Sequence, residues 1–515
     1  MAGSTRETER TYAVPDTDIS WLPDLAGAGR VACVADRGTQ ELDAVYYDSD
    51  DLRLTRTHAS LRRRTGGADA GWHLKLPLPG DSREEIQAPL KSEDIPEELR
   101  DLVLSRTRGA ALRPVMRIRS SRSLHHLLDA EGDVLAELSM DEVSAQALLD
   151  DEGRATWTEM EVELAEDGDP DLLDGVEKVL RRHGLDRAQS PSKVVHALTE
   201  ATSLLEHAPG TPGARADAVP GSAGAYVLAY MNRLVGALTD LDPAVRRDTP
   251  DSVHQMRTTA RRLRGCLRSY RSVLDRQATG PLRRDLKWLA NELGMERDHE
   301  VLRERLTAGV RELPGELVLG PVEARLKAWD VEQRTKARRR TIDALASPRY
   351  LNLLENLKSL TEAPPVRAAK AAGEPGKVLG KALRKEYRRL AGRIEPALDM
   401  KPGPERDSAI HHARKAAKRL RYAAEAARPA LGKPAQRLGK RAKAVQQVSG
   451  AQHDSVVTRD ALRRLAVRAH AAGEPGFTWG VLHGHEGATS GARERQLPQA
   501  WAKTRAAARS KALHS

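Results

Sequence analysis

The residues best suited to chemistry form a motif that occurs twice in the second half of the chain. It reads His-x2-Arg-x3-cation-Arg-Leu-Arg, and its copies begin at His254 and His411. At about 100° per residue, the histidine and three of the cations share one face of a helix, while apolar residues occupy a separate face. Each helix therefore presents a basic stripe that suits an anionic ligand. The residues predicted to bind it are His254, Arg257, Arg261, Arg264, His411, Arg414, Lys418 and Arg421.

Neither stripe is balanced by carboxylates. Six Arg and no Asp or Glu lie between Val253 and Leu274, and five cations and no acid lie between Ser408 and Ala424. Like charges four residues apart on a helix repel each other by a few tenths of a kcal/mol per pair. We therefore expect a bound anion to offset this repulsion.

The repetition extends beyond the motif and predicts two similar helical units. A Gly-x3-Asp sequence at Gly294 is echoed at Gly450, at nearly the same distance from each histidine. Two such units form one all-α domain. A loop rich in Pro, Ala and Gly at 361–376 separates them. The expected bounds are 224–480 for the domain, about 224–360 and 377–480 for its repeats, and 481–515 for a basic C-terminal tail.

The two halves of the chain carry opposite charge. Residues 1–200 hold 25 Lys and Arg against 40 Asp and Glu, whereas residues 201–515 hold 59 against 33, for a net charge of +11. This contrast predicts two domains with separate electrostatic tasks, joined by a flexible linker at 204–223. The two cysteines, Cys33 and Cys266, do not fit a disulfide framework, and no run of 18 apolar residues occurs. We expect a cytoplasmic protein without a membrane span.

Before the linker the apolar period changes to two residues, which predicts β-strands. The clearest hairpin joins 60–65 to 72–76. Charged residues recur at even spacing in six strands, with apolar residues such as Met116 and Ile118 on the opposite, outer face. An open sheet with one wet face has this pattern. So does a closed barrel with a polar lumen, which would hold a metal and a polyanion together.

Several strand segments resemble the successive motifs of the CYTH family, the triphosphate tunnel metalloenzymes. The segments are Glu7-Thr-Glu9-Arg-Thr11, Tyr46-Tyr-Asp48, Leu61-Arg-Arg-Arg64, Trp72-His-Leu-Lys75, Arg83-Glu-Glu85, Glu159-Met-Glu161-Val-Glu163 and Ser192-Lys193. This resemblance covers residues 5–203. The helical domain, with its repeated His-x2-Arg pattern, resembles the CHAD family. The order CYTH then CHAD is a known tandem arrangement of the two families.

The resemblances imply an α+β protein: an eight-stranded antiparallel tunnel with flanking helices, followed by an all-α bundle. They imply a tunnel that hydrolyses inorganic triphosphate or a related triphosphate with Mg2+ or Mn2+, and a bundle that binds inorganic polyphosphate. Polyphosphate granules would be one location. The implied metal ligands are Glu7, Glu9, Asp141, Glu159 and Glu161, and the implied triphosphate ligands are Arg62, Arg64, Lys75, Arg83, Arg117, Arg119 and Lys193. Glu7, Glu9, Arg62, Arg64 and Lys75 are the expected catalytic set.

One departure and two other classes of function remain open. Thr11 stands where the CYTH motif has Lys, so the tunnel is either a working triphosphatase or one that is catalytically weak, altered or binding-only. The basic half also fits a nucleic-acid-binding protein. Only 3% of the residues are aromatic, however, which leaves few platforms for stacked bases. A scaffold bundle would need an exposed apolar stripe, and these helices have a basic one.

Overall fold

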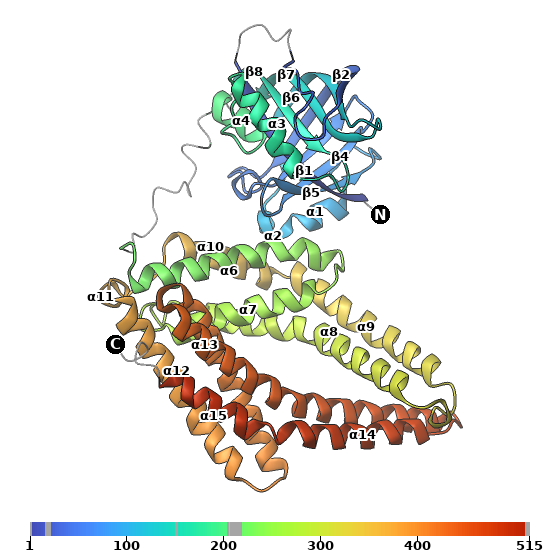
Figure 1. Ribbon diagram of the computed structural model, residues 1–515, viewed down its shortest axis with the longest axis vertical. Coiled ribbons are helices and arrows are strands. Elements are labelled where there is room, and N and C mark those ends of the chain that lie inside the picture. The colour runs from blue at the N-terminus through green and yellow to red at the C-terminus, as the bar shows by residue number, and fades with distance from the viewer. Residues whose placement is uncertain (1–2, 16–21, 150–152, 203–204, 206–218, 510–515) are drawn as a thin grey trace. The chain divides into compact units, whose positions relative to one another are not determined.

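The chain forms two compact units, Met1–Gly213 and Ala214–Ser515, shown in Figure 1. The computed structural model describes residues 3–15, 22–149, 153–202, 205 and 219–509, without the side chains of 451–453 and 489–494. The boundary between the units falls inside the predicted linker at 204–223, of which only 205 and 219–223 are described.

The first unit is a closed barrel of eight antiparallel strands. The strands are β1 (Gly3–Val14), β2 (Cys33–Asp48), β3 (Ser60–Thr65), β4 (Gly71–Pro77), β5 (Ser82–Ala88), β6 (Arg113–Leu128), β7 (Val134–Ala147) and β8 (Arg154–Leu164). Around the barrel their order is β1-β5-β4-β3-β2-β6-β7-β8. The predicted tunnel is therefore confirmed, and the open sheet is excluded.

Apolar residues that alternate with charged ones attach helices to the outside of the barrel. Met160 and Val162 on β8 are fully buried in a cluster with Val176 of α3 (Asp171–Arg182). Leu74 on β4 packs in a second cluster with Leu99 of α1 (Glu97–Leu102), which is followed by α2 (Leu104–Thr107). The residues between these apolar positions then face the lumen.

One end of the lumen is filled by α4 (Lys193–Ala201). Ala197 and Leu198 of α4 pack on Met116 and Ile118 of β6, and on Val143 of β7. Met116 and Ile118 lie on the same side of β6 as Arg122, which faces the lumen. Their expected place on the outer wall is therefore wrong, because α4 gives this end of the barrel an apolar interior.

The second unit is helical throughout its described part. Its longer helices are α6 (Ala223–Arg246), α7 (Ser252–Ser269), α8 (Gly280–Glu312), α9 (Val322–Ala346), α10 (Pro348–Glu362), α12 (Pro375–Asp399), α13 (Pro404–Ala471), α14 (Phe477–Glu494) and α15 (Leu497–Ala508). The short α11 (Ala368–Ala371) lies in the loop predicted to separate the repeats. No described helix is long and apolar enough to cross a membrane.

The long helix α13 turns back on itself at Gly432. This residue has φ 57° and ψ −137° and is flanked by Pro429 and Pro434, which cannot continue regular helical hydrogen bonding. Gly439 beyond the turn lies against Ala424 before it. The result is an antiparallel hairpin of two helices, which matches the hairpin of α7 and α8 in the first repeat.

The described part of the C-terminal segment at 481–515, whose packing the sequence left open, packs into the helical body. Trp501 of α15 is 4% exposed and stacks on Tyr387 of α12 with the ring centroids 5.7 Å apart. Trp479 and Leu482 of α14 are buried with Leu306 of α8. These helices complete the core of the second unit.

Candidate functional site

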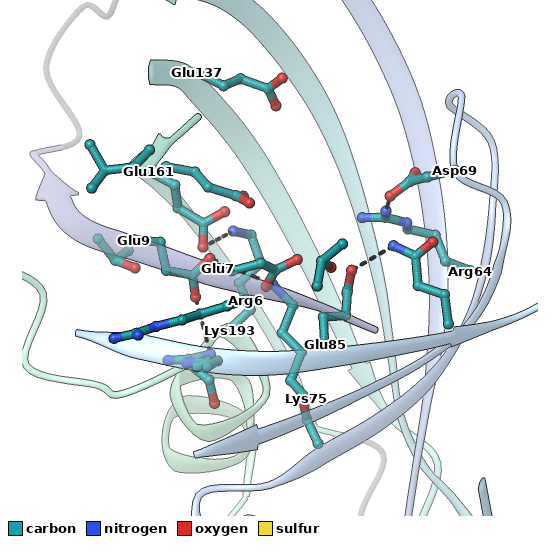
Figure 2. Close-up of a pocket in the computed structure, with 18 of the residues that line it drawn as sticks. Arg6, Glu7, Glu9, Arg64, Asp69, Lys75, Glu85, Glu137, Glu161 and Lys193 are labelled. Atoms are coloured by element: carbon teal, nitrogen blue, oxygen red, sulfur yellow. Dashed lines mark hydrogen bonds and ion pairs between the residues drawn. The ribbon is translucent and has the colours of Figure 1, made fainter. Parts of the chain in front are cut away.

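A polar cavity of about 530 Å³ occupies the barrel lumen. Cations and carboxylates from both sides of the barrel line it, as Figure 2 shows. Its Lys and Arg residues are Arg6, Arg62, Arg64, Lys75, Arg83, Arg122 and Lys193, and its acids are Glu7, Glu9, Asp69, Glu85, Glu137, Glu161, Glu163 and Glu166. The sequence-predicted residues Glu7, Glu9, Arg62, Arg64, Lys75, Arg83, Glu161 and Lys193 are thus brought together.

Three carboxylates converge on one cationic position. The Nζ atom of Lys193, in the first turn of α4, lies 2.9 Å from Asp141, 2.5 Å from Glu159 and 2.7 Å from Glu161. The carboxylate oxygens of these three acids lie within 4.8 Å of one another. Such hard oxygen ligands suit Mg2+ or Mn2+. These three are the described residues whose arrangement fits a metal ion.

The other two predicted metal ligands belong to a neighbouring cluster. Glu7 pairs with Lys75 at 2.7 Å, and Glu9 pairs with Lys75 at 3.5 Å and with Arg83 at 3.2 Å (Figure 2). Both carboxylates hold basic side chains in the lumen. The structure thus separates the predicted set of five metal ligands into a converging group of three and a pair engaged with cations.

Burial changes the protonation of two acids in the lumen. It raises the pKa of Glu7 to about 7, against the opposing effect of Lys75. Burial also raises the pKa of Glu163 to about 8, and the negative charges of Glu7 and Glu9 add to this rise. For Glu161, burial opposes ionisation, but Lys193 and Arg122 hold its pKa well below the ordinary range. Near neutral pH the lumen therefore contains both protonated and ionised carboxyl groups.

Arg117 and Arg119 do not reach the lumen, in contrast to their predicted role as triphosphate ligands. Arg117 bonds Asp43 of β2 at 2.9 Å through Nε, and Arg119 bonds the same carboxylate at 3.3 Å. Neither lines the cavity. Ile118 and Arg122 lie on the inner face of β6. Because side chains alternate along a strand, the odd-numbered Arg117 and Arg119 point outward.

Arg122 is the inward-facing cation of β6 that the sequence did not single out. Its Nε and Nη2 atoms each lie 2.7 Å from Asp141, and Nη2 also lies 3.1 Å from Glu161. His73 is a second omission. It is buried, and its Nδ1 lies 3.0 Å from Glu85. The position of His73 two residues before Lys75 on β4 was the available signal.

Thr11 lines the cavity where the CYTH motif has Lys. It is paired across the strands with Glu161, and Glu9, two residues earlier, is paired with Glu163. No cation within 4.0 Å of Glu163 is found in the described part of the chain. A lysine at position 11 would therefore add a cation on β1 next to Glu161 and Glu163 of β8.

In the helical unit, the two repeated motifs line shared grooves. A groove of about 400 Å³ brings together His254, Arg257 and Arg261 of α7 with His411, Arg414 and Lys418 of α13. An adjoining groove of about 480 Å³ shares Arg257, Arg261 and Lys418 with it and adds Arg264. Arg421 lies over the Tyr422 ring, 4.6 Å from its centroid, and lines neither groove.

The Gly-x3-Asp repeat positions the first arginine of each motif. The guanidinium of Arg257 lies flat on Gly294, where an added Cβ would come within 3.3 Å of it, and Arg257 bonds Asp298 at 2.7 Å. In the second repeat, Gly450 gives Arg414 the same room, with a Cβ distance of 3.2 Å. The two repeats therefore hold their arginines in the same way.

The cations of the shared grooves outnumber the two acids that line them, Asp298 and Asp454, and they repel one another. Burial, followed by the charges of Arg261 and Arg414, lowers the pKa of Lys418 to about 6. Burial and neighbouring arginines also lower the pKa of Arg261 from its ordinary value. A bound anion would remove this electrostatic strain, as the sequence predicts.

Comparisons with known proteins cover both units. The CYTH domain model matches residues 6–198, and the CHAD domain model matches residues 229–463. The protein MT2285 of Mycobacterium tuberculosis, strain CDC 1551, is 38% identical over 495 residues, which span 93% of this chain and 92% of that protein.

Two solved structures are similar to part of the chain. PptA from Streptomyces chartreusis has a TM-score of 0.45 at 21% identity, covering 54% of this chain and 99% of PptA. The CHAD domain from the plant Ricinus communis has a TM-score of 0.44 at 25% identity, covering 58% of this chain and 97% of that domain.

Proposed function

The chain belongs to the proteins in which a CYTH domain precedes a CHAD domain, and on this premise we propose that it couples a metal-dependent triphosphatase to a polyphosphate-binding module. CYTH domains are triphosphate tunnel enzymes that depend on a metal ion. The observation that carries the hydrolase proposal is a cavity lined by several cations and by Glu161, one of three convergent carboxylates.

The cations of the lumen supply what phosphoryl transfer needs from a protein, which is positioning and neutralisation of charge. Arg62, Arg64 and Lys75 from adjacent strands bind the oxygens of inorganic triphosphate or a related triphosphate. Arg83 and Arg122 reach the same cavity from other strands. A water adds to the terminal phosphorus as the bond from that phosphorus to the bridging oxygen breaks. The terminal phosphate becomes orthophosphate, and pyrophosphate is the leaving group, which can take the proton that the water loses.

Asp141, Glu159 and Glu161 would hold Mg2+ or Mn2+. A metal bound there supplies charge neutralisation at the phosphate oxygens and a lowered pKa for a bound water. Lys193, whose Nζ atom contacts all three acids, holds their oxygens close to one another. Lys193 also gives α4 a direct role in the site.

The test is release of orthophosphate from tripolyphosphate by the full chain. We expect activity with Mg2+ or Mn2+, none in EDTA, and loss of most activity in the double variant Glu159→Gln, Glu161→Gln. A matched variant, Glu98→Gln with Glu142→Gln, removes two exposed acids that do not line the cavity, and it should keep wild-type activity. Robust hydrolysis in EDTA would overturn the metal-dependent mechanism.

The second candidate is a tunnel that binds triphosphate without hydrolysing it. Thr11 favours it, because a hydroxyl gives the transition state one hydrogen bond and no charge. Tripolyphosphate would then bind, with a dissociation constant measurable by calorimetry, while no orthophosphate appears even with metal present.

For the helical unit we propose a linear polyphosphate ligand. Seven of the eight predicted residues line the two adjoining grooves. Among the described residues that line these grooves, Tyr422 is the one Phe, Trp or Tyr. The ligand is therefore held by charge instead of by stacked bases. Long-chain polyphosphate should compete for the full chain far better than duplex DNA at the same salt concentration, and the reverse order would favour nucleic acid.

A further inference from the structure

A third basic groove lies beyond the two repeated motifs. It has a volume of about 630 Å³ and runs between the C-terminal end of α7, the segment around α11 and the first half of α12. Nine of its fourteen lining residues are Lys or Arg. They are Arg268, Arg271, Arg276, Arg367, Lys370, Lys377, Lys381, Lys385 and Arg389.

This groove adjoins the two that contain the motifs. Arg268 lines both the third groove and the groove of Arg264. That second groove in turn shares Arg257 and Lys418 with the groove of the histidines. A row of three adjoining, cation-lined grooves thus extends from His254 to the N-terminal part of α12, which is orange in Figure 1.

Most of the charge in the third groove is exposed and uncompensated. Glu386 is the one acid that lines it. Its side chain is 3% exposed and already bonds Arg389 at 2.9 Å and Arg419 at 2.8 Å. Among the described residues, six of the nine cations form no ion pair with a carboxylate: Arg268, Arg271, Arg276, Lys370, Lys381 and Lys385.

The lysines of α12, like the cations of the two motifs, repeat at four-residue spacing without an acid between them on that face. Lys377, Lys381 and Lys385 are spaced by four residues and are all exposed. Like charges at this spacing destabilise a helix by a few tenths of a kcal/mol per pair. The arrangement therefore costs stability in the free protein, and a bound polyanion would reverse that cost.

We propose that the third groove is an extension of the polyphosphate site that only long chains can reach. The inference rests on the proposed polyphosphate-binding function of the motifs. Short chains occupy the two motif grooves, and a longer chain continues past Arg268 along the lysines of α12. The extension adds phosphate contacts, so the protein discriminates between polyphosphates by length.

The nature of the lining argues for polyphosphate over nucleic acid along the three grooves. Val378 and Ala382 are the apolar residues of the third groove, and no aromatic residue lines it in the described structure. Bases of a single strand would find no stacking partner there. A compact anion would fill one groove and leave the others empty, whereas a flexible linear anion can follow all three.

The test compares two variants of the full chain that lose the same charge. The extension variant carries Lys377→Gln, Lys381→Gln and Lys385→Gln. The control carries Lys327→Gln, Arg388→Gln and Lys401→Gln, three exposed cations that line none of the three grooves. Both keep the barrel intact, so binding in the lumen cancels in the comparison. Dissociation constants are measured with polyphosphates of about 10 and about 100 units over a range of salt concentrations.

We expect the extension variant to bind the long chain about tenfold more weakly and the short chain with unchanged affinity. Its slope of log affinity against log salt should fall by about 2 for the long chain, since three phosphate contacts are lost. The control should match the wild type for both lengths. Circular dichroism checks that both variants keep their helices.

The outcomes distinguish failure of the third-groove extension from failure of the proposed polyphosphate binding by the motif grooves. Equal losses for both lengths, or no loss for either, would overturn the extension and leave the motif site in place. A loss confined to duplex DNA or single-stranded RNA would assign the groove to nucleic acid and refute the inference. If wild-type protein binds neither polyphosphate, the proposed function itself fails.

Discussion

At the scale of single residues, Thr11 is a neutral side chain beside the acids of β1 and β8 in the barrel lumen. Thr11 of β1 is paired with Glu161 of β8. Glu163, two residues further along β8, is paired with Glu9. We predict that Thr11→Lys raises the rate of tripolyphosphate hydrolysis, because it adds a cation to the developing negative charge. The measurement is kcat with saturating Mg2+.

A neutral side chain of similar length is the control for this substitution. Thr11→Met should give no gain, since it fills space without adding charge. If Thr11→Lys also gives none, the interpretation as a weakened active site is wrong, and the tunnel that only binds becomes the better explanation.

We predict that Lys418 makes the proposed polyphosphate binding depend on pH. Burial and the surrounding arginines Arg257, Arg261, Arg414 and Arg421 lower its pKa to about 6 in the free protein. A bound polyanion favours the charged form and raises this pKa, so binding takes up a proton above pH 6. Affinity should therefore be highest below about pH 6 and fall as pH rises, by at most about tenfold per pH unit for one proton.

Lys418→Arg is the matched control for the pH effect, since arginine stays charged throughout this range. The variant keeps His254 and His411, so the difference between the two pH profiles isolates Lys418. Identical slopes for wild type and variant would show that another group causes the dependence.

At the scale of elements, the contact between the motif arginine and the facing helix can be tested directly. We predict that Gly294→Ala with Gly450→Ala weakens polyphosphate binding about fivefold, about 1 kcal/mol, because each Cβ displaces a guanidinium. The same change should not lower the melting temperature, since alanine stabilises a helix interior relative to glycine.

The control is Gly392→Ala on α12, where an added Cβ meets nothing within 4 Å. It should raise stability slightly and leave binding unchanged. Loss of binding in both variants, or in neither, would contradict a positioning role for Gly294 and Gly450.

The elements also show where the sequence was sufficient and where it was not. Alternating charge on β1, β3, β4 and β8 predicted which side chains face the lumen, most clearly on β4 and β8, whose other face is apolar. On β6 the inner face changes along its length from Ile118 to Arg122. This change depends on α4 filling one end of the barrel, a tertiary contact that no local period encodes.

At the scale of the whole molecule, the last helix contributes to the core of the second unit. We predict that Trp501→Ala destabilises that unit by about 3–5 kcal/mol, the usual cost of removing a large buried aromatic side chain. In calorimetry only the transition of the helical unit should move, because the barrel has its own core clusters. A shift of both transitions would mean that the units unfold together.

The sequence did not predict this contribution, because α15 has few large apolar residues. Between Leu497 and Ala508 the chain is mostly Ala, Lys and Arg around a single tryptophan. Such a composition is typical of an exposed basic tail. The stacking of Trp501 on Tyr387 is a long-range contact, so it could be recognised only in the folded unit.

The hairpin in α13 has a consequence for how the chain can change in length during evolution. Arg414 lies 18 residues before Gly432 and Gly450 lies 18 residues after it, so the contact between them depends on equal arms. An insertion of one residue in either arm would rotate the remainder of that arm by about 100° and shift it by about 1.5 Å, which would move the arginine away from its glycine. Insertions and deletions should therefore be rare between Arg414 and Asp454. They should be tolerated after Ala471, in the loop that joins α13 to α14. Length, as well as residue type, is under constraint in this part of the chain.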